Sequence, residues 1–163
     1  MTTTPDTTTP DTTTTDTTAP DNALAAQRHR SLLDFYARQM HAADSDDADA
    51  YARTFTEDTV FVSNALPAPV RGRETVREST RRFGAARAAR GVVRRHLLTS
   101  MTVDDLPDGA LATRSYVLLV ETPRGGGPQA YLSTVCADEV ITGDEGWQVR
   151  RRTVQRDDLP PLG

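Results

Sequence analysis

Apolar residues recur at helical spacing in the first part of the chain. Leu32, Phe35, Tyr36 and Met40 are three or four residues apart or adjacent, so on a helix they share one face. The spacing predicts a helix over residues 23–43 with a single apolar face.

A shorter helix is expected after a run of acidic residues. Asp46 or Asp47 can cap it, because a short side-chain oxygen accepts a free N–H of the first turn. Tyr51 and Phe55 lie one turn apart on one side of this helix. Residues 56–58, Thr-Glu-Asp, are expected to form a turn.

A short strand and a third helix follow. Residues 59–62, Thr-Val-Phe-Val, are typical of a strand. Gly72 precedes a third helix that is expected to continue to about residue 89. Its large apolar positions are few, Val76 and Phe83 among them, so it is expected to lie at the surface with one narrow buried edge.

The second half of the chain is rich in β-forming residues. The expected strands are residues 92–103, 110–122, 129–142 and 147–156. Their short connections suit antiparallel neighbours, since parallel strands need long crossovers. Helices followed by such a meander predict an α+β fold, in which a twisted sheet curls around the helices that cover one face. The space between sheet and helices is the natural place for a pocket.

One histidine lies inside the first long strand. Because alternate residues point to opposite faces, His96 shares a face with Leu98 and Ser100. This mixed surface is typical of the lining of a ligand cavity. The same pattern also fits a strand histidine that makes one hydrogen bond and has no chemical task, and the periodicity leaves both interpretations open.

An acidic residue follows the apolar face of the first helix. Asp44 comes four residues after Met40, so one more helical turn would direct it along the same face. An acid there needs a partner or an opening to water; alternatively, Asp44 only ends the helix or caps the next one. If Asp44 meets His96, the carboxylate fixes the tautomer of the ring, and the other ring nitrogen can exchange a proton near neutral pH.

Other catalytic patterns are missing from the sequence. It has no H-E-x-x-H, C-x-x-C or G-x-S-x-G motif and no glycine-rich phosphate loop. The three histidines are separated and lack metal-ligand spacing, so neither a metal nor a cofactor is expected. Cys136, the only cysteine, is expected to be a small buried hydrophobic residue, and the absence of an internal disulfide fits a reducing cytoplasm.

The formal net charge of −4 originates in the N-terminal segment. Its negative charges are those of Asp6, Asp11, Asp16 and Asp21. The remainder is therefore close to neutral, which argues against nucleic acid as the main partner, although arginine runs at 94–95 and 150–152 keep that alternative open. No apolar run is long enough to span a bilayer, and the N-terminus does not resemble a secretory signal, so no membrane partner is expected.

The composition divides the chain into three parts. Residues 2–21 repeat a five-residue unit of the type TTTPD and contain no aromatic or large aliphatic residue. Such a segment cannot bury enough surface to offset the entropy of ordering, so residues 1–22 are expected to be a disordered tail. Residues 23–158 are expected to form one domain, and residues 159–163 a C-terminal tail.

Six short motifs follow one another in a characteristic order and spacing. They are Asp44-Ser45-Asp46-Asp47-Ala48-Asp49-Ala50-Tyr51, Phe55-Thr56-Glu57-Asp58-Thr59-Val60-Phe61, Arg71-Gly72-Arg73-Glu74, Arg95-His96-Leu97-Leu98-Thr99, Ala112-Thr113-Arg114-Ser115-Tyr116, and Gly146-Trp147-Gln148-Val149 leading to Arg152. Together they resemble the SnoaL-like branch of the nuclear-transport-factor-2-like superfamily, which includes polyketide cyclases and scytalone dehydratase. The resemblance covers roughly residues 28–157.

The resemblance implies a cone-shaped fold, an α+β barrel in which a curved antiparallel sheet wraps around three helices and encloses a pocket. It also implies that Asp44 orients His96, as the matching residues do in scytalone dehydratase-like members. Two groups of the dehydratase site differ here. Glu121 stands where the dehydratases carry a second histidine, and Ser63 stands where they carry a water-holding tyrosine.

These observations predict a cofactor-independent acid–base enzyme of secondary metabolism. It would be a cyclase, dehydratase or isomerase acting on a polyketide-like or aromatic small molecule, as in antibiotic biosynthesis. His96 would be the general acid or base and Asp44 its orienting partner. The further candidates for substrate-binding groups in the pocket are Tyr51, Arg114, Tyr116, Glu121 and Asp138.

Two other functions remain open. The fold can serve as a non-catalytic ligand-binding or assembly subunit, as in the small subunits of ring-hydroxylating dioxygenases, and His96 would then be a core residue. A hydrolase, such as an epoxide hydrolase, rests on analogy of fold alone. The exposed sheet face in this fold commonly pairs with a copy of itself, so a homo-oligomer, most simply a dimer, is expected.

Overall fold

The helices form where the apolar spacing predicts them in the computed structural model, which describes residues 18–162. Helix α1 spans Thr18–Asp44, α2 spans Ala48–Arg53 and α3 spans Arg73–Ala89. Helix α1 therefore begins before the predicted start at residue 23, and residues 1–17 of the predicted tail lie outside the described residues. No helix in residues 18–162 is long and apolar enough to cross a membrane.

One six-stranded sheet forms the second layer. Its strands are β1 Phe55–Ser63, β2 Val70–Arg71, β3 Val92–Asp105, β4 Leu111–Pro123, β5 Gln129–Gly143 and β6 Gly146–Arg156. The sheet order is β2-β1-β6-β5-β4-β3, and β3 to β6 form an antiparallel meander. The four long strands agree with the predicted ranges to within two residues at each end.

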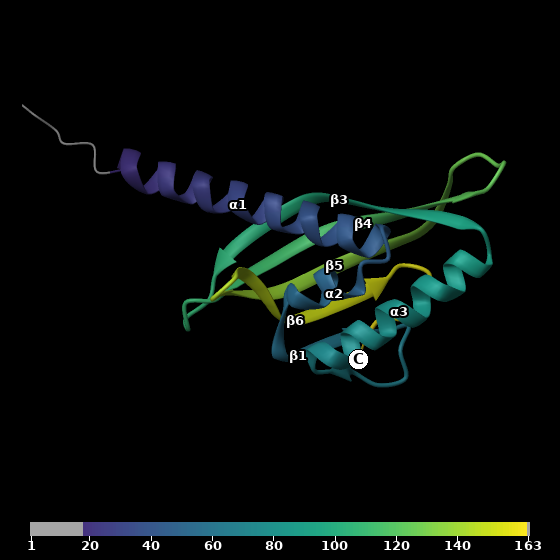
Figure 1. Ribbon diagram of the computed structural model, residues 1–163. Helices are drawn as coiled ribbons and strands as arrows, with labels where there is room; N and C mark the ends of the chain where they lie inside the picture. Colours follow the sequence, from purple (N-terminus) through teal and green to yellow (C-terminus); the bar gives the residue numbers. More distant parts are fainter. Residues whose placement is uncertain (1–17, 163) are drawn as a thin grey trace, which may run out of the picture.

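The three helices cover one face of this sheet, which curves around them (Figure 1). Helix α1 packs on β3, while α3 packs on β1 and β3. Strands β2 and β3 stand at opposite edges of the sheet and do not pair, so the sheet is curved but does not close into a barrel. The predicted α+β class, with a curved sheet around three helices, is confirmed.

Strand β1 departs from the prediction. The predicted turn at residues 56–58 is wrong, since these residues belong to β1. The prediction of Phe55 on the second helix is also wrong, because α2 ends at Arg53 and Phe55 is the first residue of β1.

Strand β1 runs parallel to β6, with Phe55 beside Val149 and Phe61 beside Arg152. The register shifts between Phe55 and Val60, so residues 56–58 continue the strand across this irregularity. The Thr59 hydroxyl also donates to the Val149 carbonyl at 3.1 Å. The sheet therefore contains one parallel pair in an otherwise antiparallel order.

An irregularity in β3 changes which residues face the helices. Ser100 has a φ of 53°, and the pairing of β3 with β4 shifts register there, which marks a β-bulge. His96 and Leu98 face the interior, but Ser100 is exposed and Met101 packs inward. The prediction that Ser100 shares the face of His96 and Leu98 is therefore wrong, because the bulge inserts one residue into the alternation.

Apolar clusters hold the helices on the sheet. One cluster joins α1 to β4 and β5 through Leu32, Tyr36, Leu111 and Val140. A second joins α3 to β1 and β6 through Phe55, Val76 and Val149. Full burial of one such side chain contributes about 1.5–3 kcal/mol, so these contacts fix the positions of the helices over the sheet.

The opposite face of the sheet is not covered by any described element. Leu97 and Leu118 are cross-strand partners on β3 and β4, and both are exposed, as is the neighbouring Tyr116. The expected homo-oligomer, in which a second copy would cover this face, stays a prediction.

Candidate active site

A cavity of about 180 Å³ lies between the helices and the inner face of the sheet. Its walls are mostly apolar, with a few polar groups at separate positions, which is typical of a small-molecule site. The lining residues are Met40, Ala43, Tyr51, Phe61, Ser63, His96, Leu98, Val117, Leu119, Leu132, Thr134, Cys136, Arg152, Val154 and Arg156.

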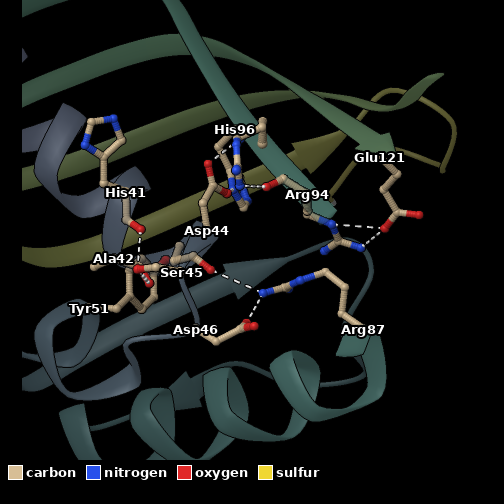
Figure 2. A network of polar contacts seen from close by, with 12 residues as sticks. His41, Ala42, Asp44, Ser45, Asp46, Tyr51, Arg87, Arg94, His96 and Glu121 are labelled. Atoms are coloured by element: carbon tan, nitrogen blue, oxygen red, sulfur yellow. Dashed lines mark hydrogen bonds and ion pairs between the residues drawn. The ribbon is translucent and has the colours of Figure 1, made fainter. Parts of the chain in front are cut away.

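Asp44 and His96 form a close pair (Figure 2), and His96 is the member that lines this cavity. The ring Nδ1 of His96 lies 2.6 Å from Asp44 Oδ1, and the backbone N–H of His96 donates to Asp44 Oδ2 at 3.1 Å. An ionised carboxylate only accepts hydrogen bonds, so Nδ1 carries the shared proton. The second nitrogen, Nε2, has no hydrogen-bond partner among residues 18–162 and can exchange a proton with a bound molecule.

The position of β3 explains both contacts of Asp44. Because β3 is an edge strand, one side of it lacks a neighbouring strand and leaves backbone N–H groups unpaired. Asp44, the last residue of α1, satisfies the one at His96. The carboxylate is 8% exposed and the imidazole 21% exposed, so the ring can meet both the cavity and solvent.

Helix α3 holds the chain on both sides of Asp44. Arg87 donates to the carbonyl of Ala43 at 3.3 Å and pairs with the carboxylate of Asp46 (Figure 2). Gly84 permits this close approach, because a Cβ at that position would lie 2.6 Å from Asp46 Oδ1 and the carboxylate would have to move. Asp46 itself has a φ of 61°, a conformation in which aspartate is tolerated better than most residues. These contacts fix the direction of the Asp44 side chain.

A second carboxylate pair lies deeper in the structure. Arg152 donates from Nε to Asp138 Oδ1 at 2.9 Å and from Nη2 to Asp138 Oδ2 at 2.6 Å. Nη2 also donates to Gln39 Oε1 at 2.6 Å, and the Tyr36 hydroxyl donates to Asp138 Oδ2 at 2.8 Å. Burial lowers the pKa of Arg152, but the charge of Asp138, the hydrogen bond to Asp138 and smaller contributions from Cys136 and Tyr51 together outweigh burial and raise this pKa well above its ordinary value. The guanidinium is therefore a permanent buried cation.

Glu121 does not join the Asp44–His96 pair. Glu121 of β4 is the cross-strand partner of Arg94 on β3 and accepts hydrogen bonds from it (Figure 2). Its carboxylate also accepts a hydrogen bond from Arg90 at 2.9 Å. Burial raises the pKa of Glu121, but these two arginines outweigh burial and hold the pKa below its ordinary value. Glu121 does not line the cavity, so its prediction as a pocket group is wrong, because both carboxylate oxygens are bound to arginine.

The other predicted binding residues divide between the two faces of the sheet. Tyr51 lines the cavity. Asp138 lies behind it, bound to Arg152. Arg114 and Tyr116 are exposed on the outer face of β4, where they alternate with inward residues. Their prediction as pocket groups is therefore wrong.

Arg152 and Gln39 are polar residues of the interior that the sequence pattern does not single out. Simple alternation from the buried Val149 would direct Arg151 inward. Instead, the register between β5 and β6 shifts after Val149, Arg151 is exposed and Arg152 is buried. Three consecutive arginines give no signal for the position of the bulge, so only the pairing of the strands identifies the buried one.

Cys136 lines the cavity as a buried side chain. Burial, together with the charge of Asp138, raises the pKa of the Cys136 thiol well above its ordinary value. The thiol is therefore uncharged at neutral pH and a poor nucleophile. In residues 18–162, no group of three or more His, Cys, Asp or Glu side chains is arranged to hold a metal ion.

A family model described as the SnoaL-like domain matches residues 25–153. The chain belongs to the SnoaL-like family. The match covers all three helices from residue 25 onward and most of the sheet, including both members of the Asp44–His96 pair. No protein among the curated ones matches this chain.

Several solved structures share the fold of this chain. ActVI-ORFA from Streptomyces coelicolor is 27% identical, with a TM-score of 0.77 over 83% of this chain and 99% of that one. A structure from Catenulispora acidiphila in complex with S-DNPA is 30% identical, with a TM-score of 0.71 over 82% and 96%. An NTF2-like protein with a cystatin-like fold from Novosphingobium aromaticivorans is 22% identical, with a TM-score of 0.72 over 89% and 92%. The predicted SnoaL-like family is confirmed by the family match, and the NTF2-like structure shares the fold of this chain.

Proposed function

We propose that this SnoaL-like protein is an acid–base enzyme, a cyclase, dehydratase or isomerase, that acts on a polyketide-like aromatic small molecule. The observation that carries the proposal is the Asp44–His96 pair at the wall of an apolar cavity, with Nδ1 of His96 2.6 Å from Asp44 Oδ1. His96 is the general acid or base, and Asp44 is its positioning residue.

The three reaction types share one elementary step, the transfer of a proton to or from carbon beside a carbonyl group. Nε2 of His96 takes the proton, and the carboxylate of Asp44 stabilises the resulting imidazolium through Nδ1–H. The same nitrogen then returns the proton to carbon or to a leaving hydroxyl. A positioned general base of this kind contributes about 10²–10⁴ in rate.

The match to the SnoaL-like family, whose resemblance implies polyketide cyclases, supports the substrate class. The Catenulispora acidiphila structure is a complex with S-DNPA, so a protein of this fold binds a small molecule. The apolar lining of the cavity is compatible with a flat ring system, and its few polar groups can orient one.

Exchange of carbon-bound hydrogen tests the proposal. The bicyclic aromatic ketone 2-tetralone is incubated with protein in deuterium oxide, and NMR follows deuterium incorporation beside its carbonyl. We expect the wild type to accelerate exchange, and His96→Ala to lower the protein-catalysed rate about 10²-fold or more.

The matched control is His41→Ala, because His41 lies near the pair but does not line the cavity (Figure 2). This variant should keep the wild-type rate. Equal exchange rates for the wild type and His96→Ala would overturn the proposal.

A further inference from the structure

One hydroxyl in the cavity has a proton without an acceptor. Tyr51 lines the cavity together with His96, and its hydroxyl oxygen lies 3.2 Å from Arg152 Nη1. A guanidinium has donors only, so the oxygen of Tyr51 accepts in this bond. Within residues 18–162, the Tyr51 hydroxyl makes no other hydrogen bond, so its proton is available to a molecule in the cavity.

The hydroxyl is held in a fixed position. Asp138 and Gln39 accept the hydrogen bonds from Nε and Nη2 of Arg152, and the guanidinium lies 5.2 Å above the ring of Phe55. The Tyr51 ring in turn packs edge-on against Phe55, with ring centroids 5.1 Å apart. A donor that is already oriented needs no rearrangement when charge develops on a substrate, which is the condition for effective electrostatic catalysis.

The protonation state of Tyr51 suits a donor. Burial raises the pKa of Tyr51, and this effect outweighs the opposing charge of Arg152. The phenol is therefore neutral at physiological pH and keeps its proton. The guanidinium beside its oxygen polarises the O–H bond and strengthens it as a donor.

The hydroxyls of Thr134 and Ser63 and the guanidinium of Arg156, which also line the cavity, make hydrogen bonds within the protein. The Thr134 hydroxyl donates to the Val117 carbonyl at 3.1 Å. Arg156 binds Asp158 through two nitrogens. Ser63 accepts from the backbone N–H of Ala65 at 3.2 Å and is not polarised by a charged group in any described contact.

We propose that Tyr51 is a catalytic residue that donates a hydrogen bond to the carbonyl oxygen of the substrate while His96 removes a proton from the adjacent carbon. The inference rests on the proposed function and narrows the substrate to an enolisable aromatic ketone. The C–H bond breaks, its proton moves to Nε2 of His96, and its electron pair becomes the C=C bond of the enolate. The carbonyl oxygen takes up the negative charge and accepts the hydrogen bond from Tyr51.

Substitution of Tyr51 by phenylalanine removes only the hydroxyl. In the 2-tetralone exchange assay, Tyr51→Phe should lower kcat about 10²-fold, as the loss of one oxyanion donor typically does, with a much smaller change in KM. The matched control Tyr116→Phe removes a tyrosine hydroxyl on the exposed outer face of β4, away from the cavity, and should keep kcat near the wild-type value. Exchange by Tyr51→Phe at the wild-type rate would overturn the inference.

A measurement on the wild type is independent of the stability of the variant. The carbonyl of 2-tetralone labelled with ¹³C should shift downfield on binding, because a hydrogen bond withdraws electron density from the carbonyl carbon. An apolar site without a donor would shift it upfield, and that result overturns the inference.

The two proposals fail in different ways. If His96→Ala abolishes exchange but Tyr51→Phe does not affect it, the proposed function holds and the role of Tyr51 is wrong. If His96→Ala has no effect on exchange, the proposed function is wrong as well.

Discussion

Two carboxylates of this protein each bind a nitrogen-containing side chain, one beside the cavity and one in the interior. Asp44 binds His96 at the wall of the cavity, where the side chains are 8% and 21% exposed. Asp138 binds Arg152 in the interior, where the exposed fractions are 1% and 3%. Both pairs are short, at 2.6 Å.

The partner and the exposure decide what each carboxylate can do. An imidazole changes charge near neutral pH, so a carboxylate beside it serves proton transfer. A buried guanidinium stays charged, so a carboxylate beside it only compensates that charge and fixes its direction. The first pair therefore suits chemistry, and the second pair holds the Tyr51 hydroxyl in place.

The largest effect is expected from breaking the interior pair. Asp138→Asn leaves the charge of Arg152 buried without its counterion, and such a loss costs about 3–5 kcal/mol. Urea unfolding should show this decrease in the free energy of unfolding. A loss below about 1 kcal/mol would mean that water or another group compensates the guanidinium.

Removal of the Asp44 charge beside the cavity should lower the exchange rate more than it lowers stability. Asp44→Asn removes the charge that stabilises the imidazolium of His96, and we expect exchange of 2-tetralone to fall about 10²-fold, with little loss of stability. Asp34→Asn, on the exposed side of α1, is the control for loss of a carboxylate on this helix. If Asp44→Asn lost stability but kept the wild-type exchange rate, the Asp44–His96 pair would be structural, and its proposed role in proton transfer would be wrong.

The contribution of Glu121 to the free energy of unfolding is expected to depend on pH. Its pKa lies below the ordinary value of 4.5 because Arg94 and Arg90 outweigh burial. The stabilisation is therefore fully present above pH 4.5 and is lost as pH falls through the lowered pKa. Glu121→Gln should lose about 1–2 kcal/mol at pH 7, and its difference from the wild type should shrink in acid.

Urea unfolding of both proteins at pH 7 and at successively lower pH measures this difference. A difference that stays constant into acid would show that the carboxylate charge is not responsible. The exchange rate of Glu121→Gln should match the wild type, because Glu121 does not line the cavity.

The sequence by itself determined most of the elements. The spacing of Leu32, Tyr36 and Met40 and the β-rich runs after residue 92 locate α1 and the four long strands. These are local properties, since helix and strand periodicities are written into neighbouring residues. The residues around Asp44 and His96 also suffice to identify the pair as a candidate, through the resemblance to the SnoaL-like family.

The tertiary structure decided which side chains meet. Bulges at Ser100 in β3 and beside Arg151 in β6 shift the alternation of inward and outward residues. As a result, Arg152 is buried and Ser100 is exposed, and no local pattern contains this information. The arginine partners that exclude Glu121 from the cavity come from residues 27 and 31 positions away in the sequence.

There is a physical reason why the sequence predicts the elements but not the contacts between side chains. Periodicity sets the face of a side chain only while the register of a strand is unbroken, and one inserted residue reverses it. Register is fixed by the neighbouring strands and by the helices that cover them, which are distant in sequence. The sequence therefore determined the layers of this protein and the Asp44–His96 candidate, while the Arg152 network behind Tyr51 emerged only from the packed fold.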